Sequence, residues 1–150
     1  VFRAVVCADA VGSSRRANMY VLVCDNTNFG LAVERDSLTE TARHFGLKLE
    51  FVDNTTLNIL ATSADGTTQE TSTYTGVVID GSTENFIEII HDGSAGTDNF
   101  YVNGTLAVTH STNVATGGDA EMVRVSAHNP AASGTSQSIV VNALEWSVNK

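Results

Sequence analysis

The sequence predicts an all-β protein folded as an antiparallel β-sandwich, with at most one or two short helical turns. Three observations favour this class. Short runs rich in Val, Ile, Thr and aromatic residues recur along the 150 residues, and Gly, Asn, Asp and Ser separate them. Two of these breaks, Asp65-Gly66 and Asn103-Gly104, have the composition of hairpin turns. The 3.6-residue apolar spacing of an amphipathic helix is missing from nearly the whole chain.

The runs predicted to form strands follow one another along the whole chain. The run from Phe86 to His91 shows the clearest alternation of period two, and neither of its faces is wholly apolar, so we expect both faces to be partly covered. In chain order the predicted strands are Phe2–Ala8, Met19–Cys24, Phe29–Arg35, Leu47–Val52, Thr56–Ala61, Glu70–Val78, Asn85–His91, Asn99–Val102, Thr105–His110, Met122–His128 and Ile139–Val148.

Two turns have specific chemistry. Asn103-Gly104 gives the strongest hairpin signal, because it joins Phe100-Tyr101-Val102 to Leu106-Ala107-Val108. Ala64-Asp65-Gly66-Thr67 has the same order of an Asx residue followed by Gly. Both patterns favour two-residue hairpin connections, because Asn, Asp and Gly tolerate the left-handed backbone that such turns require.

The one helical signal covers Asp36 to His44. Ser37 is placed as the N-cap, and Glu40 stands three residues later, which is the spacing of a capping box. This segment is predicted to form one or two helical turns.

Cys7 and Cys24 lie in two predicted strands near the N-terminus. If a hairpin centred between Arg15 and Arg16 joins these strands, the two cysteines stand opposite each other, and geometry then decides whether they form a cross-strand disulfide. The alternative is a pair of buried free thiols, which pack as small apolar groups. The sequence leaves both readings open.

Composition limits the classes of function. A length of 150 residues is typical of one domain, here residues 1–150. The formal net charge is −9 with only eight Lys and Arg, which argues against nucleic acid as a partner.

Membrane and zinc patterns are also missing. No apolar run approaches the length of a membrane helix, which is about 18 residues, so no membrane partner is expected. No CxxC motif occurs, and the four scattered His do not form a zinc pattern. Position 1 is Val rather than Met, so whether Val1 is the native terminus is left open.

An ordered set of motifs points to a family. Gly-aromatic strand pairs occur at Phe29-Gly30-Leu31-Ala32-Val33 and Phe45-Gly46-Leu47-Lys48-Leu49, and a hairpin follows at Thr62–Thr68. The most specific piece is Phe86-Ile87-Glu88-Ile89-Ile90 followed by Asn99-Phe100-Tyr101-Val102-Asn103-Gly104-Thr105-Leu106, and the last strand contains Val141-Asn142-Ala143-Leu144-Glu145-Trp146. This order resembles the concanavalin A-like, laminin-G-type jelly-roll family.

The resemblance covers most of the chain and implies a jelly-roll β-sandwich. The family's fold serves lectins, glycosidases, adhesion modules and the fibre or decoration proteins of tailed bacteriophages, so it does not by itself select a function. The turn sequences Asp65-Gly66-Thr67-Thr68 and Tyr101-Val102-Asn103-Gly104-Thr105, the loops rich in Ser, Thr, Asn and Gly, and the scarcity of Pro and Lys look most like the phage versions.

No catalytic residues are expected. The family's glycosidase branch carries its carboxylates on one strand, at a spacing that places nucleophile and acid in one cleft. The nearest string here runs from Glu34 through Asp36 to Glu40, where the last carboxylate is one residue too distant. No Gly-x-Ser-x-Gly motif occurs. His91, His110 and His128 fall at strand ends, where we interpret them as hydrogen-bonded polar residues rather than bases.

Two loop regions are candidates for a ligand site, because their carboxylate and amide oxygens suit a sugar or a calcium ion. The alternative at both is an Asx turn that binds nothing. Calcium is the only cofactor considered. The candidate ligand residues are Asp25, Asn26 and Asn28 in the first region and Asp92, Asp98 and Asn99 in the second.

These observations favour a non-catalytic virion structural protein, either a capsid decoration (cement) protein or a fibre domain of a phage-like virus. It is expected at the virion surface, bound to other capsid subunits and forming a homo-oligomer, with a trimer favoured. The alternative is a carbohydrate-binding adhesion module that recognises surface glycans. The residues predicted to lie at an interface are Arg3, Arg15, Arg16 and Trp146, the last as core or interface.

Overall fold

The computed structural model describes residues 1–8, 18–25, 43–51, 57–75, 84–116, 121–128 and 139–146. This described part contains strands and turns but no helix. Ten strands are present: β1 (Phe2–Ala8), β2 (Asn18–Asp25), β3 (His44–Phe51), β4 (Leu57–Ala64), β5 (Gln69–Thr75), β6 (Glu84–Asp92), β7 (Thr97–Val102), β8 (Thr105–His110), β9 (Glu121–His128) and β10 (Ile139–Trp146).

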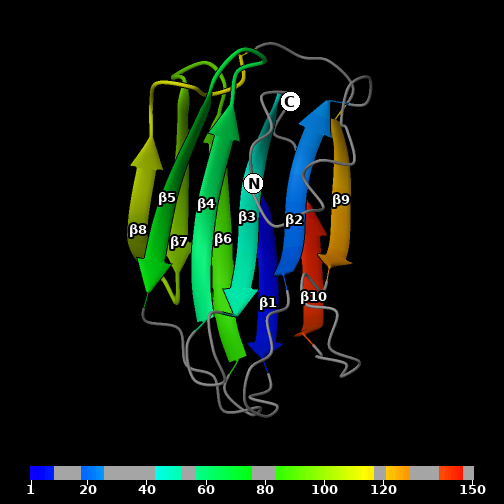
Figure 1. The fold of residues 1–150 in the computed structure, drawn as a ribbon. Helices are drawn as coiled ribbons and strands as arrows, with labels where there is room; N and C mark the ends of the chain where they lie inside the picture. The colour runs from blue at the N-terminus through cyan, green and yellow to red at the C-terminus, as the bar shows by residue number, and fades with distance from the viewer. Residues whose placement is uncertain are drawn as a thin grey trace.

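The strands form two five-stranded antiparallel sheets that face each other (Figure 1). The first sheet has the order β10-β1-β6-β7-β8, and the second has the order β5-β4-β3-β2-β9. Consecutive strands pair as meanders from β2 to β5 and from β6 to β8, while the chain changes sheet between β1 and β2, β5 and β6, β8 and β9, and β9 and β10. The all-β class and the antiparallel sandwich predicted from the sequence are therefore present.

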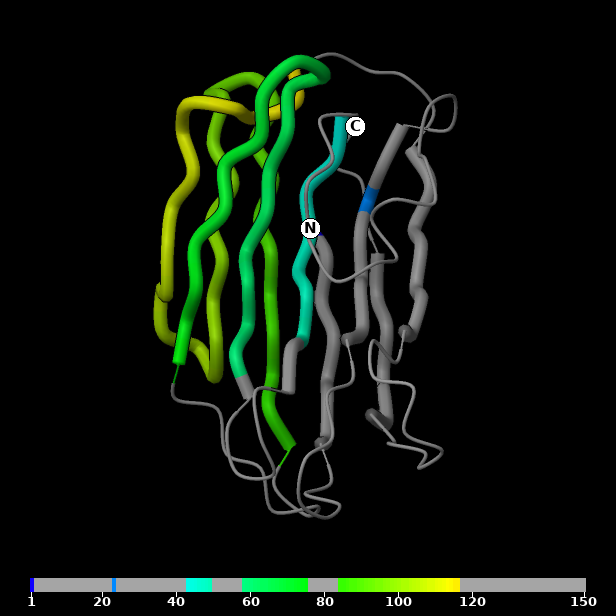
Figure 2. The backbone as a smooth tube through the Cα atoms, in the orientation of Figure 1, coloured from blue at the N-terminus to red at the C-terminus, as the bar shows by residue number. Residues whose placement is uncertain are grey.

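The apolar core lies between the sheets because alternate side chains of each strand point inward. In β6, Ile87 and Ile89 are buried, whereas Phe86 on the opposite face is 37% exposed. Leu47 and Leu49 of β3 are the corresponding inward residues of the second sheet. Both faces of β3 are covered, since the intervening Lys48 is also buried. The tube of Figure 2 follows these strands, with β3–β5 lying over β6–β8.

The turn between β7 and β8 is the predicted two-residue connection. Asn103 has φ of 51° and Gly104 has φ of 78°, which is the left-handed pair of a type I′ turn. Val102 and Thr105 pair directly across it. The Asn103 side chain also accepts the backbone N–H of Phe86 at 2.8 Å, so the turn is fixed to the neighbouring strand β6.

The prediction of a two-residue turn at Asp65-Gly66 is wrong. The paired ends of β4 and β5 are Ala64 and Gln69, so the connection has the four residues from Asp65 to Thr68. Gly66 alone in this loop has positive φ, at 103°. The longer loop is stabilised by the Asp65 carboxylate, whose Oδ1 accepts the backbone N–H groups of Thr67 and Thr68 at 2.7 and 2.9 Å.

The cysteine-bearing strands are not paired with each other, so the condition for a cross-strand disulfide is not met. β1 pairs with β10 and β6, whereas β2 pairs with β3 and β9 in the other sheet. Cys7 is opposite Val140 and Glu84, and Cys24 is opposite His44 and Met122. The Arg15-Arg16 hairpin on which the cross-strand disulfide depended does not join two paired strands.

Several strand limits differ from the predicted ones. β3 begins at His44 rather than Leu47, and β4 continues to Ala64, because polar residues there point into the space between the sheets or onto a covered face. His44 therefore belongs to a strand and not to the predicted helical segment. Two predictions lie outside the described residues, namely the strand Phe29–Arg35 and residues 36–42 of the helical segment.

Candidate functional site: a buried polar cluster

Polar side chains gather between the two sheets at the end where β4 finishes and β7 begins. We define the polar cluster as Ser63 of β4, Ser72 of β5, His91 of β6, Asp98 of β7 and His110 of β8. Ser63, Asp98 and His110 have no exposed surface, and the His91 side chain is 16% exposed. The cluster is the largest departure from an apolar core in the described part of the molecule.

Strand register places four of the five cluster residues, all except Ser72, in two rows that face each other. In the first sheet Asp98 is directly opposite both His91 and His110. In the second sheet Ser63 is directly opposite both Phe45 and Glu70. Because directly opposed residues point to the same face of a sheet, one row of three meets the other across the core.

Asp98 is the centre of the hydrogen bonds. Its Oδ1 lies 2.6 Å from His91 Nδ1, and its Oδ2 accepts the Ser63 hydroxyl at 2.6 Å. The His91 ring also stacks on Phe45, with ring centroids 4.5 Å apart and planes at 9°. A buried carboxylate requires such donors, because its desolvation is otherwise very unfavourable.

The direction of each bond around His110 follows from counting protons. The single hydroxyl proton of Ser63 is donated to Asp98, so Ser63 Oγ accepts from His110 Nδ1, 2.9 Å away. In the neutral ring the other nitrogen, Nε2, then accepts the Ser72 hydroxyl at 3.0 Å. Every polar atom of this chain of bonds is satisfied. In the described residues the one buried side-chain polar atom without a partner is Asn58 Oδ1, which is outside the cluster.

Burial controls the titration of His110. Desolvation lowers the pKa of its imidazole below the usual range, and the negative charges of Glu70 and Asp98 oppose this effect without cancelling it.

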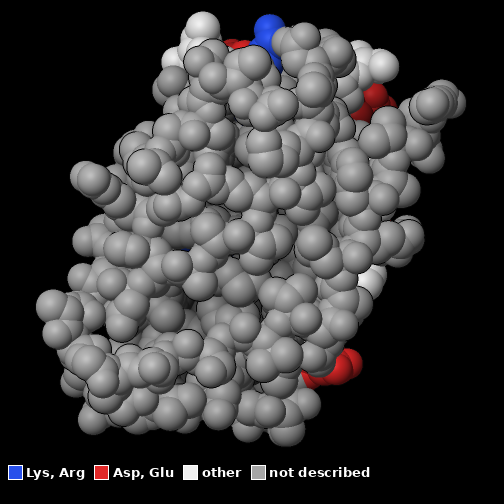
Figure 3. Space-filling model, turned by 90° about the vertical axis from the view of Figure 1, so that its right-hand side faces the viewer, with Lys and Arg blue, Asp and Glu red and all other residues white. Residues whose placement is uncertain are grey.

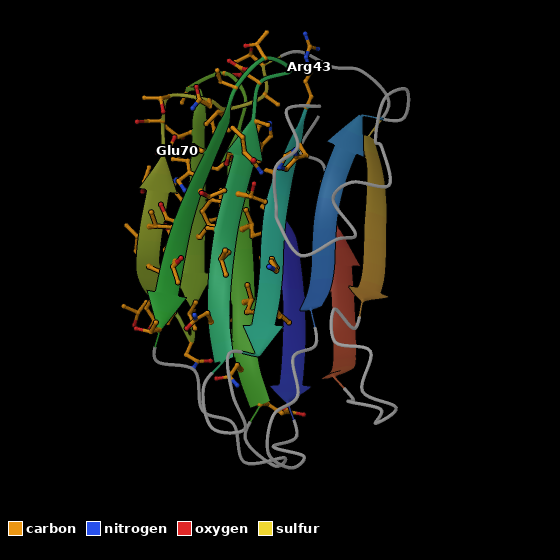
Figure 4. The ribbon with its side chains drawn as sticks, in the orientation of Figure 1. Arg43 and Glu70 are labelled. Carbon is orange, nitrogen blue, oxygen red and sulfur yellow. The ribbon has the colours of Figure 1, made fainter. Side chains whose placement is uncertain are left out.

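For the neighbouring Glu70, the effects of hydrogen bonds and charge outweigh the effect of burial. Desolvation raises the pKa of its carboxyl, but hydrogen bonds from Thr112 and Asn113 and the charge of His110 together lower it. Thr112 Oγ1 donates to Glu70 Oε2 at 2.7 Å, and Figure 4 shows Glu70 at this end of the molecule.

Gly93, in the turn after β6, lies next to the His91 ring. A Cβ atom at position 93 would lie 3.2 Å from His91 Nε2 and 3.6 Å from the backbone oxygen of Ala115. The distance to His91 Nε2 is tighter than an ordinary van der Waals contact, whereas the distance to the Ala115 oxygen is ordinary. The absence of a side chain at Gly93 therefore allows the turn after β6 to lie directly against the imidazole.

The same end of the molecule also carries exposed polar groups. The Asp65–Thr68 loop is fixed to the segment after β8 by a hydrogen bond from Thr68 Oγ1 to Asn113 Oδ1 at 2.8 Å. Arg43 packs along Gly66, with its Cγ 3.3 Å from the position of a Cβ there. Basic and acidic atoms lie together at this upper end in Figure 3, and Figure 4 labels Arg43 there.

The cluster contains Ser, His and Asp side chains but does not have the geometry of a nucleophilic triad. In such a triad the hydroxyl donates to a histidine, which the carboxylate orients. Here the Ser63 hydroxyl donates to the carboxylate itself, and no surface of Ser63 is accessible to a substrate. The arrangement is suited to joining the two sheets in one register.

The structure separates the residues of the second predicted ligand region. Asp92 is exposed, and its Oδ1 accepts the backbone N–H groups of Ser94 and Ala95, which is the ligand-free Asx turn. Asp98 points into the core, while the adjacent Asn99 is on the other face of β7 and accepts the Thr109 hydroxyl at 2.6 Å. These three residues do not converge on one point.

Other predicted residues are placed only in part. Asp25 is the last residue of β2, and Asn26 and Asn28 lie outside the described residues, as do Glu34, Asp36 and Glu40. Within the part of the chain that the structure covers, no group of three or more His, Cys, Asp or Glu side chains is arranged to hold a metal ion.

Two of the predicted interface residues lie in strands of the first sheet. Arg3 of β1 is paired with Glu88 of β6 and Glu145 of β10. Trp146 of β10 is paired with Phe2 of β1. Arg15 and Arg16 lie outside the described residues.

Sequence reasoning placed His91 and His110 correctly at strand ends as hydrogen-bonded residues but did not identify their partner. It assigned Asp98 to a loop, because β7 was predicted to begin at Asn99. The available signal was alternation, since Asp98, Phe100 and Val102 occupy one face of an extended run. Ser63 gave no signal, because its partners are 35 and 47 residues away.

No protein-family model matches the chain, and a search of curated proteins finds no match. Among the described residues, no helix has the length and apolar character needed to cross a membrane.

Proposed function

We propose that the chain is a non-catalytic structural protein of a virus particle, either a capsid decoration protein or a fibre domain of a phage-like virus. It binds other virion subunits through surface contacts at the particle's exterior. The resemblance of its motifs to phage jelly-roll domains and its acidic, Pro-poor composition support this class. The finer assignment of the sandwich as a concanavalin A-like jelly roll belongs to the same proposal.

The strand order supports the jelly-roll assignment. The chain crosses repeatedly between the sheets, and β10 returns to pair with β1 beside β6. Repeated crossing between two antiparallel sheets is the property that distinguishes a jelly roll from two independent meanders.

The observation that carries the proposal is an apolar group on the outer face of the first sheet, which we call the outer patch: Phe86, Tyr101 and Leu106. Phe86 is 37% exposed and Leu106 is 50% exposed, and they are the exposed large hydrophobic residues of the described part. Register brings Tyr101 directly opposite Leu106, on the side of the sheet away from the core. Tyr101 is half-buried between these two exposed residues, and grouped apolar side chains on an outer face favour a protein-contact surface.

Such a patch suits binding by shape complementarity. Contact with another subunit removes its apolar surface from water, and polar residues around it form the rim. A patch of three side chains gives weak binding alone, so a symmetric oligomer, which we propose to be a trimer, would multiply the contact. The net charge of −9 keeps assembled particles apart in solution.

The first test uses the native assembly. Purified particles should contain the chain in fixed stoichiometry, measured by quantitative mass spectrometry, and electron microscopy should place the outer patch against a neighbouring subunit. The double variant Phe86→Ser, Leu106→Ser should lower incorporation at least about tenfold, because each lost apolar side chain removes about 1–2 kcal/mol of contact.

The matched control is Thr73→Ala, an exposed position of the second sheet. It should incorporate normally. A chain that is monomeric in solution and absent from particles contradicts the proposal. Glycan-array binding that is lost in Asp92→Ala would instead support a carbohydrate-binding module. Asp98→Ala is unsuitable for that test, because Asp98 is part of the core.

A further inference from the structure

The two sheets meet at one side of the sandwich along their edge strands, β5 and β8 (Figure 1). Three side-chain hydrogen bonds connect β5 and the residue before it to β8 and the residues after it. We define this edge clasp as the pairs Ser72–His110, Glu70–Thr112 and Thr68–Asn113. In the first pair His110 is buried, whereas the other two hydrogen bonds are exposed to solvent.

His110 is the titratable member of the clasp that reaches the core. Ser63 of β4 and Ser72 of β5 contact its two ring nitrogens, and the Phe100 ring of β7 packs at 5.0 Å. The charged groups around it are Glu70 on β5 and Asp98 on β7. His91 of β6 reaches it only through Asp98.

The hydrogen bonds of the clasp fit the neutral imidazole. Nδ1 is a donor because Ser63 has already given its proton to Asp98, so Nε2 is the one nitrogen that can take up a proton. Protonation there reverses this hydrogen bond, so that Nε2 donates to Ser72 Oγ and the Ser72 hydroxyl proton loses its acceptor. It also places a cation on a side chain that has no exposed surface.

We propose that the edge clasp is an acid-sensitive closure, in which protonation of His110 at Nε2 releases β8 from β5. The edge strand β8, then held by β7 alone, frays, while the remaining strands stay paired. Release gives the imidazolium access to water. This property is independent of any role in a virus particle, because it depends only on contacts within the chain.

The balance between desolvation and the nearby charges determines how closure of the clasp depends on pH. Desolvation opposes the cation and outweighs the attraction of Glu70 and Asp98, so the pKa of His110 is lower in the closed clasp than in the open one. Closure is therefore most favourable above the usual imidazole pKa of about 6.5 and weakens as the pH falls below it. Between the open and closed pKa values, the opening equilibrium rises by up to about tenfold for each pH unit.

The test is amide hydrogen exchange of the unmodified protein at pH 7.5 and pH 5.5, with rates divided by those of unstructured peptides at each pH. Protection of β8 should fall several-fold at the lower pH, and protection of β1, in the middle of the first sheet, should not. Unchanged protection of β8 overturns the proposal. An equal fall in both strands also overturns it, because that result indicates global destabilisation.

The variant His110→Gln isolates the residue, because glutamine offers a donor and an acceptor but does not titrate. Its β8 protection should no longer differ between the two pH values, whatever its stability. The control His91→Gln removes the other histidine of the polar cluster and should keep the pH response. If His110→Gln does not fold, an NMR titration of the His110 ring in the unmodified protein replaces this test. A titration midpoint at or above the usual imidazole pKa contradicts the proposal.

Discussion

At the scale of single residues, His91 is restrained on three sides. Phe45 stacks on its ring, the Asp98 carboxylate holds Nδ1 at 2.6 Å, and Gly93 lies next to Nε2. The ring cannot turn away from an added atom without losing the stack or the hydrogen bond. Gly93 is therefore required for close approach and not for an unusual backbone angle.

Gly93→Ala should lower the free energy of unfolding by about 1–3 kcal/mol, because the new methyl group displaces a restrained imidazole. Urea unfolding of the single variant and of the double variant with His91→Ala measures the effect. In the His91→Ala background the cost of Gly93→Ala should nearly vanish.

Gly96 provides the control for that prediction. Its φ is +66°, and a Cβ there would have nothing within 4 Å. Gly96→Ala should cost about 1–2 kcal/mol through backbone strain alone, with or without His91. If Gly93→Ala costs the same amount in both backgrounds, contact with His91 is not the reason for the glycine.

At the scale of elements, the loop between β4 and β5 depends on one carboxylate. Backbone N–H groups of Thr68 and Thr67, followed by the Thr67 hydroxyl, lower the pKa of Asp65 from 3.8 to about 2. A carboxyl with a lowered pKa in the fold contributes stability above its unfolded pKa and loses that contribution as the pH falls through the folded value.

Asp65→Asn should accordingly be less stable than the unmodified protein at pH 7, and the difference should shrink between pH 4 and pH 2. Denaturant unfolding across this range checks the sign. Thr67→Ala, which removes one hydroxyl donor to the same carboxylate, should give a smaller difference in the same window. A stability difference that stays constant down to pH 2 would show that the charge of Asp65 is not what stabilises the loop.

The two loops also show how far local sequence predicts an element. The turn at Asn103-Gly104 was predicted correctly, because both residues adopt the positive φ that their residue types tolerate. Asp65-Gly66 has a similar composition but a longer loop. The Asp65 carboxylate accepts hydrogen bonds from Thr67 and Thr68, and Thr68 donates to Asn113 in the segment after β8. A contact distant in sequence changed the register at which the hairpin closes.

At the scale of the whole molecule, Ser63 connects the two sheets through one hydroxyl. Ser63→Ala should reduce the free energy of unfolding by about 2–4 kcal/mol, because it leaves Asp98 Oδ2 without a donor and His110 Nδ1 without an acceptor in a dry core. Thermal and urea unfolding measure the change.

Two further variants provide reference values for the stability cost of Ser63→Ala. Ser72→Ala loses one bond at the sheet edge and should cost about 1 kcal/mol. Thr73→Ala, exposed on the same strand, should change stability by less than about 1 kcal/mol. If Ser63→Ala has no larger effect than Thr73→Ala, the polar cluster does not fix the packing of the sheets.

Local sequence patterns were sufficient to predict the all-β class, most strand positions and the turn at Asn103-Gly104. Alternation of period two and left-handed turn residues are local properties, so they are visible without knowing any partner. Local patterns did not predict that the cysteine-bearing strands belong to different sheets or that Asp98 points inward to Ser63 and His91. These partners come from different strands, and sheet register and the packing of one sheet on the other bring them together.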